Sequence, residues 1–156
     1  MPTAYHRRVQ ASILEIGRGS SKIKKVWNDR RPLHIVHPTR SKSLLYYPDA
    51  RFVTRSGKFW LFEVLDSETG SQAQMIAHIV EPLLVDGVLA VVHVVKTHQE
   101  QEVLEDLTTV ILARMTDLIG RKVDSRIRYF RVVISPSDSR RTARIQRIFS
   151  DGGIRF

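Results

Sequence analysis

The chain has 156 residues, of which 42% are hydrophobic and 26% charged, a composition typical of one globular domain with a sizeable core. It contains no cysteine, which excludes disulfides, a thiol nucleophile and thiolate zinc sites, and no apolar run is long enough to span a bilayer. The formal net charge of +9 favours nucleic acid as a partner over an anionic membrane surface, with solubility alone as the competing explanation.

The first part of the chain divides into a helix and a basic region. A helix is predicted over residues 4–16, where apolar residues recur at helical spacing before two glycines. Residues 18–42 are polar and basic, apart from a short apolar run at Leu33–Val36 that predicts an edge strand. A solvated face is the plainer explanation of such charge, but a loop here would suit contacts with phosphates through Lys22, Lys24, Lys25, Arg30 and Arg31.

A β-hairpin is predicted in the central stretch, residues 41–65. Leu44–Tyr47 and Phe59–Leu65 are rich in aromatic and branched residues, as half-buried strands are. Residues 55–57 (Arg-Ser-Gly) have the composition of a tight turn. Acids interrupt this stretch at Asp49 and Glu63, and a carboxylate in such a strand is costly to bury unless a cation, a metal ion or an arginine lies beside it.

The remainder of the chain predicts a strand-helix-strand crossover unit and, at the C-terminal end, a basic helix. A helix over residues 71–84 leads to a strand, Gly87–Lys96, that is apolar enough to be buried on both faces, with His93 as a core histidine. We expect this strand to lie parallel to the Phe59 strand. A long helix (Gln99–Ile119) with an acidic start and a strand (Ile127–Ile134) follow, and then a helix whose basic residues are candidates for binding phosphates: Arg140, Arg141 and Arg144.

These elements predict a single α/β domain over residues 1–156. Its centre is a mixed sheet of about five strands, flanked by helices. The chain divides into a basic loop (18–42), a core (43–134) and a basic C-terminal helix and tail (135–156).

Two short motifs, Pro48-Asp49 and Glu63-Val64-Leu65, resemble the PD-(D/E)xK nuclease superfamily, which includes Holliday junction resolvases and many restriction endonucleases. The resemblance covers the chain from the first helix to about Lys96 and implies a restriction-endonuclease-like core. It also implies that Asp49, Glu63 and the carbonyl group of Val64 hold Mg²⁺ or Mn²⁺, which polarises the phosphate and lowers the pKa of a water molecule. The chain departs from the motif at Leu65, where the family carries a lysine that positions and activates the water.

The resemblance adds two catalytic candidates. An acid on the first helix often approaches the metal site in the family, which points to Glu15, although a surface ion pair with Arg18 or a lysine is the plainer role. Family members also place a polar residue on the helix after the motif, where Gln72 and Gln74 could reach the site, and Gln74 is taken as the candidate. For Asp49 and Glu63 themselves, the non-catalytic explanation is a buried ion pair with Arg51 or a neighbouring lysine.

Three functions remain open at this point. The favoured one is a metal-dependent DNA endonuclease with a degenerate motif, which hydrolyses phosphodiester bonds. The alternatives are an inactive nuclease-like DNA-binding protein and an unrelated basic α/β factor for RNA binding or assembly. The sequence contains no HExxH, GxSxG or P-loop motif, which disfavours a zinc enzyme, a serine hydrolase and an NTPase.

The expected partner is duplex or branched DNA, with no membrane role. A homodimer is favoured over a monomer, because duplex cleavage requires two cuts and the resembled enzymes commonly pair two sites. The start of the chain has no apolar segment for secretion. We therefore expect an intracellular protein, cytoplasmic or nucleoid-associated, with a mobile element or a virus as a conceivable source.

Overall fold

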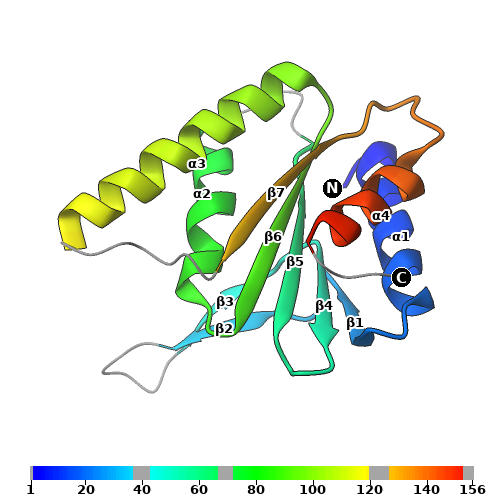
Figure 1. Cartoon of the computed structure of the whole chain (residues 1–156), viewed down its shortest axis with the longest axis horizontal. Coiled ribbons are helices and arrows are strands. Elements are labelled where there is room, and N and C mark those ends of the chain that lie inside the picture. Colours follow the sequence, from blue (N-terminus) through cyan, green and yellow to red (C-terminus); the bar gives the residue numbers. More distant parts are fainter. Residues whose placement is uncertain (1, 37–42, 67–71, 120–126, 153–156) are drawn as a thin grey trace.

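The computed structural model describes residues 2–36, 43–66, 72–119 and 127–152 (Figure 1). Residue 71, at the start of a predicted helix, and the tail from residue 153 onward lie outside the described residues. Within the described ranges, no helix is both long and apolar enough to cross a membrane.

A mixed sheet of five strands forms the centre of the fold, in the order β1-β4-β5-β6-β7. The first three of these are antiparallel neighbours, whereas β5, β6 and β7 run parallel. The α/β class, the five-stranded mixed sheet and the parallel pairing of β5 with β6 are therefore confirmed. The strands are β1 (Ile23–Asn28), β4 (Ala50–Thr54), β5 (Phe59–Val64), β6 (Val88–Val95) and β7 (Arg128–Val133).

Helices cover both faces of this sheet (Figure 1). One face packs against α1 (Ala4–Gly19) and α4 (Arg141–Asp151), and the other against α2 (Gln72–Val80) and α3 (His98–Ile119). Alternate residues of β5 therefore enter different cores. Phe62 and Val64 point towards α1 and α4, whereas Glu63 points towards α2, as does Leu65 just beyond the strand.

The helix expected over residues 71–84 is shorter than predicted. It ends at Val80, and a 3₁₀ turn, η1 (Glu81–Leu84), follows with Pro82 near its start. Proline has no backbone N–H and clashes with the preceding helical turn, so it interrupts the α-helix at this point.

The hairpin around residues 55–57 forms, but its first strand differs from the one predicted. The partner of β5 is β4, whereas the Leu44–Tyr47 run belongs to β3 (Ser43–Tyr46). This strand pairs with β2 (Leu33–Val36) in a separate two-stranded sheet. Pro48 lies between β3 and β4, and because it lacks an N–H and restricts the residue before it, one continuous strand is disfavoured there.

Part of the region predicted as a basic loop is a strand. β1 lies at the edge of the main sheet, with Lys24 and Lys25 exposed and Ile23 buried. Lysines on an edge strand discourage pairing with other chains, so these residues fit a strand in this position as well as they fit a loop. The lysines interrupt the apolar alternation on which sequence-based recognition of a strand depends.

The packing of α1 on the sheet leaves no room for a side chain at Gly17. A Cβ atom there would lie 2.5 Å from Cε1 of Phe52 and 2.8 Å from Cγ2 of Val26. We expect Gly17→Ala to lower the free energy of unfolding by about 1–3 kcal/mol in urea titrations, despite the better helix propensity of alanine. Gly19→Ala is the matched control, because a Cβ atom there meets nothing within 4 Å. Equal effects of the two changes would contradict this close approach.

Candidate functional site

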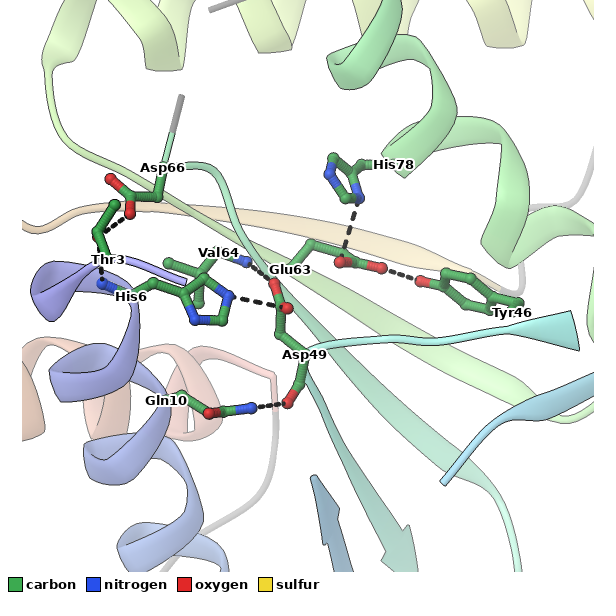
Figure 2. A network of polar contacts seen from close by, with 9 residues as sticks. All are labelled: Thr3, His6, Gln10, Tyr46, Asp49, Glu63, Val64, Asp66 and His78. Carbon is green, nitrogen blue, oxygen red and sulfur yellow. Dashed lines mark hydrogen bonds and ion pairs between the residues drawn. The ribbon is translucent and has the colours of Figure 1, made fainter. Parts of the chain in front are cut away.

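The two motif acids lie at one end of the sheet (Figure 2). Ala50 pairs with Phe62 in the antiparallel register of β4 and β5, so Asp49, the residue before Ala50, lies beside the end of β5 that carries Glu63. The same end of the sheet receives the residues that follow the parallel strands, Asp66 after β5 and Lys96 after β6. The fold thus brings together groups that are far apart in the sequence.

Glu63 is held inside the protein by two partners. The residue is only 1% exposed, and its carboxylate accepts a hydrogen bond from the Tyr46 hydroxyl through Oε1. Its Oε2 lies 3.1 Å from Nδ1 of His78 on α2. Both carboxylate oxygens are therefore engaged, and the contacts connect β5 with β3 on one side and with α2 on the other.

Burial and pairing shift the pKa values of this pair. Burial raises the pKa of Glu63, and the contacts with His78 and Tyr46 only partly oppose this effect. For His78, burial lowers the pKa, but the contact with Glu63 and the charges of Asp49 and Glu81 together outweigh burial, so the net shift is upward. The pair therefore keeps a proton to a higher pH than its two groups would in water.

His93 lies beside this pair as a neutral core residue, as expected from the sequence. It is opposite Glu63 in the parallel register of β5 and β6, and it is fully buried. Its Nε2 lies 3.1 Å from the carbonyl oxygen of His78, and burial lowers the pKa of His93 to about 3. At neutral pH the ring is therefore uncharged and can donate this hydrogen bond to the carbonyl group.

Asp49 also has a partner at each carboxylate oxygen. Oδ1 lies 2.9 Å from Nε2 of His6 on α1, and Oδ2 accepts a 2.7 Å hydrogen bond from the backbone N–H of Val64. The backbone carbonyl of Asp49 accepts a further hydrogen bond from Gln10, at 2.7 Å. The hydrogen bond with Asp49 raises the pKa of His6. Asp49 thus joins α1 to the start of β4 and the end of β5.

A third acid, Asp66, belongs to the same end of the sheet and was not predicted. It accepts a hydrogen bond from the Thr3 hydroxyl and pairs with the ammonium group of Lys96. Although burial opposes the shift, these two contacts lower the pKa of Asp66. The sequence signal was available, because Asp66 follows, and Lys96 ends, two strands that were predicted to be parallel neighbours.

A small cavity of about 280 Å³ opens between these groups. Asp49, Asp66, His6, His78 and Gln74 are among the residues of its wall. The predicted candidate Gln74 therefore lies at the site, on the exposed side of α2. Glu63 is buried and does not line the cavity.

The residues at this site do not fit a metal ion as they are arranged. Magnesium requires oxygen ligands with free lone pairs directed at the ion. The oxygens of Glu63 face Tyr46 and His78 inside the protein, and those of Asp49 face His6 and a backbone N–H group. In the part of the chain that the structure describes, no three His, Asp or Glu side chains are grouped so that they could hold a metal ion.

The other residues considered as catalytic or as partners of the acids lie away from this cavity. Glu15 is exposed on α1, nine residues beyond His6, which corresponds to about 13 Å along a helix axis. Arg51 does not act as the partner of the acids but stacks against Trp27 and Phe59, with 5.9 Å and 5.4 Å to the ring centroids. Leu65 is 4% exposed and lies in the core beneath α2 and α3.

The predicted phosphate-binding residues fall into two groups. The five at the start of the chain are all exposed, on or beside β1: Lys22, Lys24, Lys25, Arg30 and Arg31. The other three lie at α4, where Arg144 pairs with Asp138 at 2.5 Å and Arg141 donates to the carbonyl of Asp138 at 3.0 Å, while Arg140 is exposed. Comparison with known proteins found no family model, no curated protein and no solved structure that matches this chain.

The pairing of Glu63 with His78 predicts a measurable shift in an NMR titration. We expect a pKa above 6.5 for His78 in the wild type, and a clearly lower one in Glu63→Gln, where burial acts without a facing carboxylate. Asp49→Asn is the matched control, because it should lower the pKa of His6 and should lower that of His78 less than Glu63→Gln does, since Asp49 acts on His78 only as a nearby charge. An unchanged His78 titration in Glu63→Gln would contradict the pairing.

The same shifts set the sign of the pH dependence of stability. Both pKa values are higher in the folded state than in the unfolded state. The contribution of this pair to the free energy of unfolding is therefore fully present at pH values below the unfolded pKa values, 4.5 for Glu63 and 6.5 for His78. This contribution is lost as the pH rises through the pKa values of the folded state. The fall in urea midpoint above pH 6.5 should therefore be smaller in Glu63→Gln than in the wild type.

Proposed function

We propose that this chain is a nucleic-acid-binding protein with a nuclease-like core, in which the motif acids stabilise the fold and do not hold a catalytic metal ion. The arrangement of Glu63 supports this function over the others. A ligand for Mg²⁺ must direct an oxygen at the ion, whereas the carboxylate of Glu63 is buried between Tyr46 and His78. Of the functions open from the sequence, the inactive relative of a nuclease fits this arrangement best.

The resemblance to PD-(D/E)xK nucleases fits the fold of this chain. That family assignment requires β5 and β6 to be parallel neighbours, which they are, with α2 in the connection between them. It also requires the two acids to meet at one end of the sheet, and Asp49 and Glu63 do so. Both observations are compatible with a nuclease-like ancestor and do not depend on a working metal site.

Nucleic acid is the partner that the charge favours. The net charge is +9, and the five basic residues around β1 are exposed and separate from the acid network. Such side chains bind the phosphate backbone and release counterions, which gives affinity without sequence readout. We propose duplex or branched DNA as the ligand, in the cytoplasm or nucleoid of a cell.

The nuclease function remains the competing proposal and makes different demands. It requires Asp49 and Glu63 to exchange their hydrogen bonds for Mg²⁺ or Mn²⁺. It also requires a basic group in place of the missing lysine, and Leu65 packs in a core with Ile79 and Leu104. A lysine at position 65 would enter that core, far from water.

We predict DNA binding that is strongly salt-dependent and independent of divalent metal. Fluorescence anisotropy with a labelled duplex should show at least a tenfold loss of affinity between about 50 mM and about 200 mM salt. Asp49→Asn and Glu63→Gln should bind DNA like the wild type, because the affinity comes from the basic surface. No DNA form should be cleaved with Mg²⁺ or Mn²⁺ present.

Cleavage by the wild type that is lost in both of these variants would overturn the proposal in favour of the nuclease. Leu65→Lys provides a second comparison. We expect it to create no activity and to lower the free energy of unfolding by about 2 kcal/mol or more, because it buries an unpaired charge. Leu65→Met, with a similar volume, should cost less than about 1.5 kcal/mol.

A symmetric homodimer through the outer face of α3 is the assembly that we propose. Val110 is 63% exposed and Leu118 is 73% exposed, and their spacing of eight residues places them on one side of the helix. The acidic start of α3 makes this side a poor surface for DNA. Light scattering should give a dimer mass for the wild type and a monomer mass for Val110→Glu, and a wild-type monomer at high concentration would exclude the dimer.

A further inference from the structure

A second and larger cavity, of about 700 Å³, lies along β7, at the edge of the sheet opposite β1. Figure 1 shows α3 and α4 on opposite sides of this strand, and residues from both helices line the cavity. Among the described residues of its wall, lysine and arginine side chains outnumber carboxylates five to two. The five are Lys96, Arg131, Arg140, Arg144 and Arg147.

Of the basic residues in the cavity wall, Arg131 is the one that a bound anion would stabilise most. It extends from β7, and its Nε is buried with no hydrogen-bond partner among the described residues. Burial lowers the pKa of Arg131, and the charge of Glu105 on α3 offsets only part of this effect. A partly buried guanidinium group without a bound acceptor is costly, and an anion in the cavity would remove that cost.

The acids in the wall do little to neutralise the cavity. Asp138 is already engaged, because it pairs with Arg144 at 2.5 Å and accepts a 2.8 Å hydrogen bond from the backbone N–H of Arg140. Asp151 lies exposed at the end of α4. The side chains of Arg131, Arg140 and Arg147 therefore leave the cavity with a positive excess.

The cavity also adjoins the acid network of the sheet. Lys96 lines it and pairs with Asp66, which lines the smaller cavity beside Asp49. The start of α3 does not provide the anion site, because the carboxylate of Glu100 accepts hydrogen bonds from the backbone N–H groups of Lys96 and Thr97. An anion would therefore be held by arginine side chains.

We propose that the cavity between α3, β7 and α4 is a phosphate-binding site, in which Arg131, Arg140 and Arg147 hold phosphate groups. Guanidinium groups bind phosphate oxygens through paired hydrogen bonds, and several arginines around one cavity suit a ligand with more than one phosphate. A nucleic acid backbone is the source that the charge of the chain favours, and a free nucleotide presents the same groups. The choice of nucleic acid as the ligand rests on the proposed function. It places the phosphate backbone of the nucleic acid along β7, at the edge of the sheet.

The test compares two double variants that remove the same charge. Arg140→Gln/Arg147→Gln changes exposed residues of the cavity wall, and Arg8→Gln/Arg114→Gln changes exposed arginines outside it. With a labelled DNA duplex, the cavity variant should lose at least about tenfold in affinity, and the slope of log affinity against log salt should fall by about two. The control variant should lose less than about threefold, because distant charges are screened.

Calorimetry with inorganic pyrophosphate separates the two sources of phosphate. Binding of pyrophosphate and of DNA by the wild type, both weakened selectively in the cavity variant, supports the site with a nucleic acid ligand. Selective loss of pyrophosphate binding by a protein that binds no DNA supports the site but overturns the nucleic-acid function. Equal losses of DNA affinity in the two double variants overturn the site and leave that function standing. A wild type that binds neither probe overturns both.

Discussion

The fold depends on how a carboxylate is stabilised inside the sheet. Glu63 belongs to the strand at the middle of the sheet, where an ionised group without partners would cost several kcal/mol. The hydroxyl of Tyr46 and the imidazole of His78 offset that cost, and each belongs to a different element. The need to satisfy one side chain thus fixes the small β2–β3 sheet on one side and α2 on the other. Asp49 has the same role on the opposite face, where His6 fixes α1.

Carboxylates at these positions can either bind a metal ion or stabilise the fold, and the neighbouring side chains decide between these two roles. A metal site needs oxygen atoms with free lone pairs, whereas a structural site needs a donor at each oxygen. Here histidines from α1 and α2 lie at the two acids, and the raised pKa values of His6 and His78 favour the protonated, donating form. The apolar side chain at Leu65 agrees with this arrangement, because a basic group there would have no place in the core below α2.

Sequence patterns predicted the elements of the fold better than their partners. The apolar run of β6 and the regular spacing in α2 were sufficient for the parallel crossover, because burial on both faces leaves a continuous pattern. β1 was missed because Lys24 and Lys25 interrupt its alternation, and the strand before the turn at Gly57 was misassigned because two apolar runs competed for that place. Pairing depends on long-range packing that no local pattern reports.

The candidate site shows the same limit. Asp49 and Glu63 were identified from a short motif, but their partners His6 and His78 lie on separate helices, and neither position has a local signal. The expectation of an arginine or lysine partner was reasonable, since those side chains most often accompany a buried carboxylate. In the structure, Arg51 instead contacts aromatic rings. The type of partner follows from which side chain the packing of each helix brings within reach, and that is a property of the tertiary structure.

The arrangement of charge is compatible with acids and the proposed phosphate-binding cavity lying close together. A phosphate near free carboxylates is repelled, and in this chain each of the three acids carries its own cation: His6 for Asp49, His78 for Glu63 and Lys96 for Asp66. The acid network is therefore close to neutral when the histidines are protonated, and its field at the neighbouring cavity is weak. In the proposed site, the arginines of that cavity are therefore the charged groups that a phosphate would meet. Lys96 contributes to both environments, so the neutralisation of Asp66 and the positive charge of the cavity share one side chain.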